Sequence, residues 1–235
     1  MEAKDLAAAL VGLPVFAGLN ERELGRVVEA ARRRKLDKDD TLFEQGDPPE
    51  AFFLLLSGRL KVGQVTPEGR HVIVRYIGPR EMAGCVAVCG GLSYPGTAVA
   101  VEDSWVLAWS RMAVARLTER YPIIALNVMR IMGSRMQELQ QRLREMQTER
   151  VERRIAHALA RLAGQAGRRS ESGVEIDFPL SRQDLAEMTG TTLHTVSRTL
   201  SAWEGQGILD LGRQRVTIVK PHAVVAIAGD LGDAA

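Results

Sequence analysis

Cysteine is nearly absent from this chain: its 235 residues contain two, Cys85 and Cys89. A disulfide framework is therefore not expected, and a reducing compartment, the cytoplasm, is the expected location. Long apolar runs are lacking too, because stretches such as Ala51 to Leu56 are far too short to span a bilayer. No secretory signal peptide and no internal repeat are evident at the start or along the chain. These absences favour a cytoplasmic protein without a membrane partner.

An excess of one charge is missing as well. The formal net charge is +2 and the isoelectric point is near 8.7, so bulk charge alone does not indicate nucleic-acid binding. The basic residues are instead clustered locally, at Arg32 to Lys35 and at Arg150 to Arg154. The chain is 46% hydrophobic, which is enough for two modest domains, each with its own core.

The string LSRQDLAEMTGTTLHTVSRTLSAW predicts two short helices joined by a tight turn. Ser181 is a good N-cap for the first helix, and Asp184 completes a capping box. Gly190 stands where the chain must reverse, because glycine adopts a left-handed backbone without steric cost. Thr191 or Thr192 can cap the second helix.

The spacing in this string is typical of a helix-turn-helix. Ala186 lies four residues before the turn glycine and Val196 six after it, where the motif needs a small residue and a β-branched plug. Leu193, Val196, Leu200 and Trp203 recur at helical spacing and are predicted to face inward. The outer face then carries Thr192, His194, Thr195, Ser197, Arg198 and Ser201. Such a face suits a phosphate-lined groove, although an ordinary helical hairpin in a core is the alternative.

Short strands are expected on both sides of this motif. Val174 to Phe178 predicts one strand, and Ile208 to Val219 predicts two strands around a Gly-Arg-Gln-Arg turn. A helix-turn-helix followed by a small hairpin is a winged helix. In the first half of the chain, helices are expected at Leu6 to Val15 and Glu21 to Ala31. Strands at regular spacing then indicate an antiparallel barrel or jelly roll, at Thr41 to Phe43, Ala51 to Leu56, Leu60 to Val65, His71 to Ile77, Ala98 to Val101 and Trp105 to Trp109.

A long helix that opens at Pro122 connects the two halves. Its apolar residues follow alternating spacings of three and four, as in a coiled coil; they are Met129, Met132, Met136, Leu139, Leu143 and Met146. Such a stripe could pack on its own barrel. The helix is roughly 38 Å long, more than a small barrel covers, so we expect a second chain. The seam stops near Thr148, and we place a hinge between Thr148 and Val151.

The predicted fold class is α+β. An N-terminal antiparallel β jelly-roll barrel with a sensor role occupies residues 1–121. The dimerisation helix and hinge occupy residues 122–150. A C-terminal winged helix-turn-helix occupies residues 151–235.

This pattern resembles the Crp/Fnr family of bacterial transcription regulators. The resemblance is carried by FEQGDPPEAFFLLLSGRLKV in the barrel, VERRIAHAL after the hinge, and LSRQDLAEMTGTTLHTVSRTL. It implies a cyclic-nucleotide-binding-like barrel, and double-stranded DNA, a homodimer and RNA polymerase as partners. The string from Thr192 to Arg198 and the stretch around Tyr94 are most similar to the NnrR type, which responds to nitric oxide.

The barrel departs from the family's cyclic AMP receptors. They hold the ribose with an acid where this chain has Cys85, and the phosphate with an arginine where it has Gly96. Cyclic AMP is therefore not an expected ligand, because a buried phosphate without a cation is costly. An iron–sulfur cluster is not expected either, since two cysteines cannot supply four thiolates. Haem remains a possible cofactor. The carbon-monoxide-sensing branch has its haem-ligating histidine where this chain has Val86. A haem ligand in this chain would therefore be a cysteine or one of His71, His157 and His222.

The resemblance also implies site residues for DNA. Ser197 and Arg198 match base-reading positions, and His194 replaces the usual glutamate beside them. The half-sites implied are TTG and CAA. The positions implied for phosphate contacts are Arg182, Thr192 and Thr195, and the wing tip adds Arg213 and Arg215. Simpler alternatives exist for several of these residues. Arg198 could contact a phosphate alone, and His194 could contact only the DNA backbone. Arg213 and Arg215 could be solvated at the hairpin tip.

Cys85 and Cys89 are four residues apart and would share one face of a helical turn. There they could form a redox or sensor pair, or they could simply be small buried hydrophobic residues. We expect no resident metal site and no catalytic residues, because no nucleophile–base pair, ligand cluster or phosphate loop is visible. The expected function is a dimeric DNA-binding regulator that responds to nitric oxide or redox. The alternative is a cyclic-nucleotide-gated signalling subunit that acts through a protein partner; an enzyme has little support.

Overall fold

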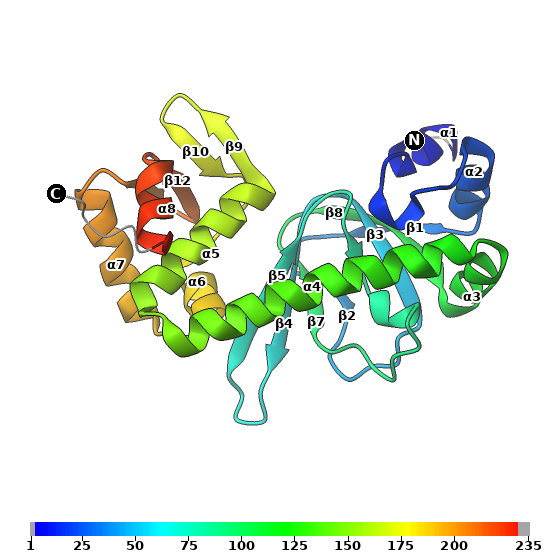
Figure 1. Cartoon of the computed structure of the whole chain (residues 1–235), viewed down its shortest axis with the longest axis horizontal. Helices are drawn as coiled ribbons and strands as arrows, with labels where there is room; N and C mark the ends of the chain where they lie inside the picture. Colours follow the sequence, from blue (N-terminus) through cyan, green and yellow to red (C-terminus); the bar gives the residue numbers. More distant parts are fainter. Residues whose placement is uncertain (1–2, 230–235) are drawn as a thin grey trace. The chain divides into compact units, whose positions relative to one another are not determined.

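The computed structural model describes residues 3–229, which divide into two compact units. The barrel unit holds the chain through Val65 together with Arg75–Leu139. The second unit contains the predicted helix-turn-helix, and we call it the reader unit. It holds Thr66–Val74 and the chain from Gln140 onward. Figure 1 shows the first eight strands around the barrel and the helices α5 to α8 in the reader unit. The division falls within the long helix rather than at its end.

Two short α-helices and a 3₁₀ turn precede the barrel: α1 (Ala3–Leu10), η1 (Pro14–Phe16) and α2 (Glu21–Glu29). The single helix expected at Leu6 to Val15 is wrong. It ends at Leu10 because Gly12 has a φ of 74° and Pro14 starts a separate turn. Asn20 caps α2 in a full capping box with Glu23, as expected of an N-cap.

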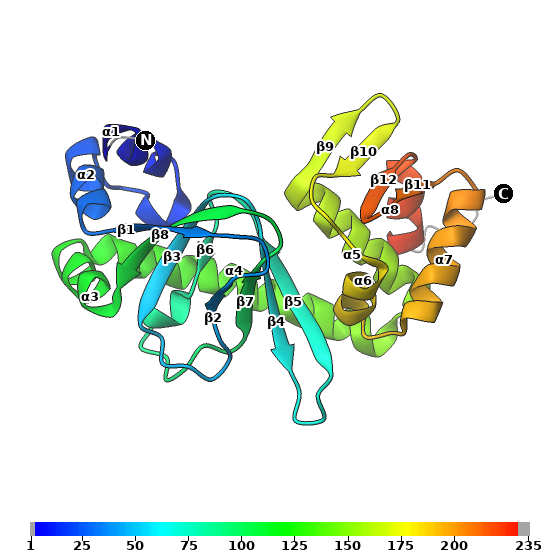
Figure 2. The same ribbon diagram turned by 180° about the vertical axis from the view of Figure 1, so that it is seen from behind.

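The barrel consists of two four-stranded sheets with the orders β1-β8-β3-β6 and β2-β7-β4-β5. The described register pairs are antiparallel, as a jelly roll requires, and Figure 2 shows both sheets from behind. The expected strands are present within one or two residues, and β1 and β6 were not predicted from the sequence. The strands are β1 (Arg32–Leu36), β2 (Thr41–Phe43), β3 (Ala51–Ser57), β4 (Leu60–Val65), β5 (His71–Ile77), β6 (Met82–Ala83), β7 (Thr97–Ala100) and β8 (Ser104–Ser110).

Strand β3 is buried on both of its faces. Phe52 and Leu54 belong to a core shared with α1, α2 and the start of α4. Phe53 and Leu55 belong to the core between the two sheets. Side chains alternate across a strand, so two apolar cores require a continuous apolar run. This explains why AFFLLL lacks the polar alternation of a half-exposed strand.

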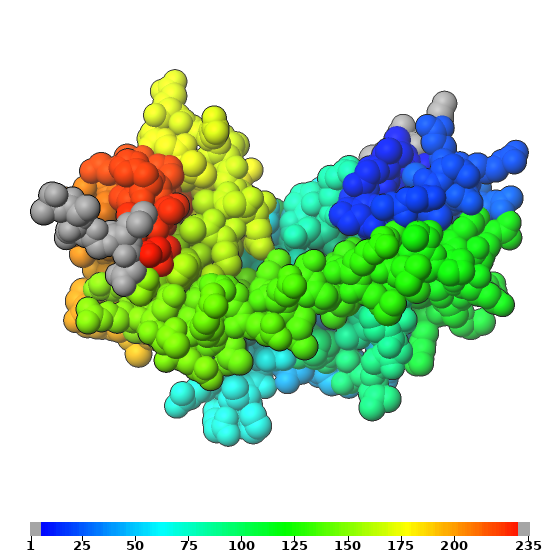
Figure 3. Space-filling view, in the orientation of Figure 1, coloured from blue at the N-terminus to red at the C-terminus, as the bar shows by residue number. Residues whose placement is uncertain are grey.

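After β8 the chain forms α3 (Arg111–Arg120) and then α4 (Pro122–Thr148). The start of α4 packs on the barrel unit: Ile124 and Val128 are buried, and Asn127 donates to the carbonyls of Val15 and Ala17. Further along, the expected seam is open to solvent, with Met129, Met136, Leu139, Leu143 and Met146 exposed. Figure 3 shows the surface of α4 uncovered on the viewed face. Met132 differs, because it is half-buried against the barrel core.

The reader unit contains a four-stranded antiparallel sheet, β11-β12-β10-β9, and four further helices. The Gly/Ser/Arg-rich segment between 164 and 173 is mostly regular structure, since α5 continues to Ala166 and β9 follows at once as the edge strand beside β10. Two residues, Glu149 and Arg150, separate α4 from α5, where the hinge was expected. The elements are α5 (Val151–Ala166), β9 (Gly167–Ser170), β10 (Gly173–Ile176), α6 (Arg182–Thr189), α7 (Leu193–Gly205), β11 (Leu209–Gly212), β12 (Arg215–Ile218) and α8 (Pro221–Gly229).

Candidate nucleic-acid interface

Helices α6 and α7 form because their ends are capped by local side chains. The Ser181 hydroxyl accepts from the backbone N–H of Asp184 at 3.0 Å, and the Asp184 carboxylate accepts from the N–H of Ser181 at 3.0 Å. Gly190 ends α6 with a φ of 60°. Thr192 caps α7 by accepting from the N–H of Thr195 at 3.2 Å. The predicted capping box, turn glycine and second cap are confirmed.

The two helices are held together by the predicted small and β-branched residues. Ala186 and Val196 are buried where α6 and α7 meet, and Leu200 and Trp203 continue the buried side of α7. Leu193 is an exception. It was expected to face inward, but at the first position of α7 it is 47% exposed. The apolar stripe of α7 therefore starts one turn later, and a large apolar side chain stands on the outer face.

The outer face of α7 presents the side chains that were predicted to read DNA. His194, Arg198 and Ser201 are exposed, and Ser197 is half-buried between them. Histidine and arginine four residues apart lie on the same side of a helix, within reach of neighbouring base pairs. Arginine can donate two bonds to the guanine edge, and serine can bond to several bases. The structure thus brings the three proposed base-reading residues together.

Phosphate-binding candidates surround this helix. The hydroxyls of Thr192 and Thr195 lie 2.9 Å apart at the start of α7, and Arg182 is exposed at the start of α6. Phosphate contacts of this kind set the position of a protein on DNA without reading its sequence. A groove of about 450 Å³ runs between the start of α6, the start of α7 and the wing turn, with Arg182 and Arg213 on its lining.

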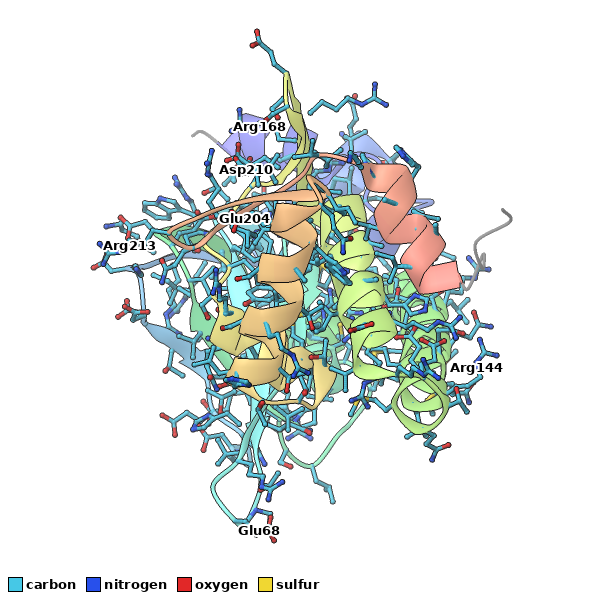
Figure 4. The ribbon with its side chains drawn as sticks, turned by 90° about the vertical axis from the view of Figure 1, so that its left-hand side faces the viewer. Glu68, Arg144, Arg168, Glu204, Asp210 and Arg213 are labelled. Carbon is cyan, nitrogen blue, oxygen red and sulfur yellow. The ribbon has the colours of Figure 1, made fainter. Side chains whose placement is uncertain are left out.

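The wing is the β11–β12 hairpin. Its turn is tied to the start of α6, because Leu180 donates its N–H to the carbonyl of Gln214 at 3.0 Å. Arg213 extends into solvent at the wing tip beside α7 (Figure 4). Arg215 instead pairs with Asp210 on the neighbouring strand at 3.1 Å, and both side chains are about half exposed. Arg213 is therefore the freer of the two arginines for a phosphate.

An acid near the reader is also engaged within the wing. The carboxylate of Glu204, on α7, accepts from the N–H of Leu211 at 3.2 Å. Figure 4 shows Glu204 and Asp210 near the wing end of α7. Glu204 thus holds the start of the hairpin on α7, and Asp210 is paired with Arg215 within the hairpin.

In the barrel unit, one of the two expected sensor residues, Cys85, lies beside α4. Cys85 is buried in the short 3₁₀ helix η2 (Cys85–Ala87). Cys89 is exposed, and its backbone N–H donates to the carbonyl of Cys85 at 3.2 Å. Arg135 of α4 donates to Cys85 Sγ at 3.2 Å and to the carbonyl of Met82 at 3.0 Å. Burial, followed by the charge of Cys85, raises the pKa of Cys89.

A second guanidinium lies near this point. Arg75 donates to Glu81 at 3.0 Å, and burial, followed by the neighbouring charge of Arg135, lowers its pKa. Glu81 acts in the opposite direction. Arg75 is thus paired with Glu81, whereas Arg135 bonds the thiol of Cys85 and the carbonyl of Met82.

The position of the receptors' phosphate-binding arginine is closed by backbone. A Cβ on Gly96 would stand 2.7 Å from the carbonyl oxygen of Gly63, so an arginine could not be accommodated without a shift of β4. The next hydroxyl, that of Thr97, accepts from the N–H of Gln45 at 3.0 Å. The backbone at Gly96 and the hydroxyl of Thr97 are thus both engaged within the barrel.

No cluster of three or more metal-ligating side chains occurs among residues 3–229. The candidate haem histidines are scattered: His71 is exposed on β5, His157 lies on α5 beside Glu149, and His222 is exposed on α8. The structure therefore does not bring them together. Within the same described part of the chain, no helix has the length and apolar character needed to cross a membrane.

Sequence reasoning missed two pairs of side chains. Arg135 and Cys85 are 50 residues apart, and Arg161 and Glu145 join α5 to α4. Neither pair leaves a local signal, because each partner reads as a charged or polar residue on its own element. Leu193 was missed because apolar periodicity alone placed it in the core.

An antiparallel barrel of the cyclic nucleotide-binding type, a long helix and a winged helix-turn-helix in one chain define a DNA-binding transcription regulator. A model of the cyclic nucleotide-binding domain matches residues 33–121, and a model of the Crp-like helix-turn-helix domain matches residues 153–227. With these matches and the relatives below, the chain belongs to the Crp/Fnr family. It is a regulator rather than an enzyme.

Two relatives and one solved structure illustrate the similarity. The cyclic AMP receptor protein of Thermus thermophilus is 30% identical over 217 residues, which cover 92% of this chain and 97% of the relative. The transcriptional activator protein FnrA of Stutzerimonas stutzeri is 29% identical over 227 residues, covering 96% and 93%. The structure of FixK2 from Bradyrhizobium japonicum has a TM-score of 0.74 at 21% identity, covering 87% and 98%, and it supports the fold.

Proposed function

We propose that this chain is a homodimeric regulator that binds a palindrome with TTG and CAA half-sites and recruits RNA polymerase. The observation that carries the dimer is the exposed apolar stripe of α4. Five large apolar residues lie there at coiled-coil spacing, and exposed apolar stripes of this size mark interaction sites: Met129, Met136, Leu139, Leu143 and Met146.

A dimer with two-fold symmetry requires two half-sites about one helical turn apart. Within each half-site, Arg198 would read the guanine, and Ser197 would lie beside a thymine. His194 would set the preference at the base pairs next to that core. Arg182, Thr192, Thr195 and Arg213 would bind phosphates, with a smaller part for the paired Arg215.

We propose further that the barrel does not use cyclic AMP, although one relative bears the name of a cyclic AMP receptor. The thiol of Cys85 and the closed position at Gly96 support this proposal. The assignment to the NnrR-type branch, and with it a response to nitric oxide or redox, stays a prediction. The thiol of Cys85 supports it better than a histidine ligand for haem, because Arg135 of α4 bonds to Cys85, whereas His71 is exposed on β5.

A selection from random DNA with the full-length protein tests the function. Enrichment of inverted TTG and CAA motifs is expected. Enriched sites without this inverted pair would overturn the assignment of α7 as the base-reading helix. Reporter output under nitric oxide or a peroxide, compared with Cys85→Ser and Cys89→Ser, tests the signal. An unchanged response in both variants would exclude the thiols as the sensor.

A further inference from the structure

The corner between α4 and α5 is built around a buried carboxylate. Glu145, near the end of α4, is 3% exposed. One guanidinium nitrogen of Arg161, on α5, donates to both of its oxygens at 2.9 and 2.8 Å, and Gln141 donates to it at 3.3 Å. A buried charge is tolerated where it is paired and hydrogen-bonded, so this carboxylate needs Arg161 in place.

A histidine lies one turn away on the same face of α5, close to two carboxylates. The imidazole Nε2 of His157 is 3.1 Å from Glu149, and its Nδ1 is 4.0 Å from Glu145. His157 and Arg161 are four residues apart, so they form one stripe along α5. That stripe faces the end of α4, although the two helices are joined by only two residues of chain.

The same end of α4 also contacts the helix-turn-helix. The methyl group of Met146 fills the space that a Cβ on Gly190 would need, against the turn between α6 and α7. Arg154, on α5, donates to the carbonyl of Met146 at 3.2 Å. The last turns of α4 are therefore fixed to α5 by charge and to the reading motif by packing. We call Glu145, Arg161, Met146 and Gly190 the corner contacts.

These last turns belong to the reader unit, which begins at Gln140. Two residues of the apolar stripe, Leu143 and Met146, lie within it. If two copies of α4 pair along the stripe, each reader is attached to a helix end whose position the partner helix sets. The separation and rotation of the two α7 helices then follow from the corner contacts, since two linking residues alone would leave them loose.

We propose that the corner contacts fix the spacing between half-sites that the dimer accepts, with Glu145 and Arg161 as positioning residues rather than DNA contacts. The inference rests on the proposed dimer. It goes beyond it by assigning spacing selectivity to a buried ion pair that touches neither DNA nor effector. A loose corner would let each reader find its half-site at several spacings.

The test uses the full chain and a set of palindromes in which base pairs are added or removed between constant half-sites. Each base pair rotates one half-site by about 34° relative to the other. The protein should prefer one spacing by about tenfold. The double variant Glu145→Met with Arg161→Met removes both charges together, so no unpaired charge stays buried. Its preference should fall below about threefold.

Three measurements keep the outcomes separate. Glu152→Gln, an acid-to-amide change at an exposed position of α5, should retain the spacing preference. Sedimentation should show a dimer for every variant, and affinity for a single half-site should be unchanged. If melting shows that the double variant is unfolded, Arg161→Lys replaces it, and a reduced preference is again expected.

A folded variant that keeps the full spacing preference would overturn the inference. Absence of dimers or of palindrome binding in the unaltered protein would instead overturn the proposed function.

Discussion

Arg135 of α4 donates a hydrogen bond to the sulfur of Cys85 across 3.2 Å, and its other terminal nitrogen donates to the carbonyl of Met82. The long helix is thereby tied to η2, the short turn that carries the thiol. Its partners are a thiol and a carbonyl, so no carboxylate stands opposite Arg135 in these two hydrogen bonds.

Cyclic AMP should not bind to the barrel at physiological concentrations. The phosphate would lie near Gly96, where the backbone leaves no room for an arginine, so this position cannot supply the cation that a buried phosphate requires. Calorimetry on the unaltered protein should therefore show no heat of binding with micromolar cyclic AMP. A dissociation constant in that range would contradict this account of the pocket.

The two thiols should differ in their reactivity. Cys85 is buried, so Cys89 should be alkylated first by iodoacetamide in the folded protein. Because burial raises the pKa of Cys89, less thiolate is present near neutral pH, and its rate should keep rising with pH beyond the point where an ordinary cysteine levels off. Peptide mapping by mass spectrometry measures both rates. Faster labelling of Cys85, or a Cys89 rate that levels off early, would be inconsistent with this environment.

Leu139→Lys should convert the protein to monomers. It places a charge in the exposed apolar stripe of both helices, and we expect the dimer dissociation constant to rise by tenfold or more. Glu138→Lys, one residue away on a charged face, is the matched control and should stay dimeric. Sedimentation velocity distinguishes them; equal behaviour of the two variants would place the interface elsewhere.

Arg198→Ala and Arg182→Ala should affect DNA binding in different ways. Loss of Arg198 should cost about 1–3 kcal/mol per half-site and flatten discrimination at the guanine. Loss of Arg182, exposed at the start of α6, should weaken binding to all sequences alike and lower its dependence on salt. Titrations with the palindrome and a guanine-substituted site, at two salt concentrations, measure both effects. Full guanine preference in Arg198→Ala would contradict its role.

Gly190→Ala should destabilise the reader unit by about 1–2 kcal/mol, because a left-handed residue gains a Cβ there. The methyl group of Met146 would also have to move. Gly164→Ala is the control within α5, where a Cβ meets nothing within 4 Å. That change should stabilise the helix by about 0.5–1 kcal/mol. Denaturant unfolding of both variants measures the change in the free energy of unfolding, which should fall for Gly190→Ala and rise for Gly164→Ala. A decrease for Gly164→Ala would show that helix propensity does not determine the stability change at that position.

Features with a local physical cause could be predicted from the sequence. Ser181, Gly190 and Thr192 each bond a group three or four residues away, so the caps and the turn of the helix-turn-helix were predictable. Six of the eight barrel strands were also predicted, because turn residues separate their apolar runs. The α4 stripe was predicted from its spacing, and the structure leaves it exposed.

Features that depend on distant neighbours could not be predicted. Strand β1 reads as a basic run, and it becomes a strand because it pairs with β8 some seventy residues later. Glu145 looks like one more acid on a charged helix until Arg161 buries it. Leu193 follows the apolar period of α7, yet it precedes the turn at which that helix meets its core.

Strand β3 has a practical meaning for anyone who shortens this protein. Phe52, Leu54 and the indole of Trp109 pack against the helices before the barrel, and Trp109 donates to the carbonyl of Val27 at 2.7 Å. A chain that begins at β1 would lack the helices that cover one face of β3. The exposed apolar face of the sheet would then be prone to aggregation. Helices α1 and α2 therefore complete the core of the barrel unit, and a fragment meant for crystallisation or biosensor use has to keep them.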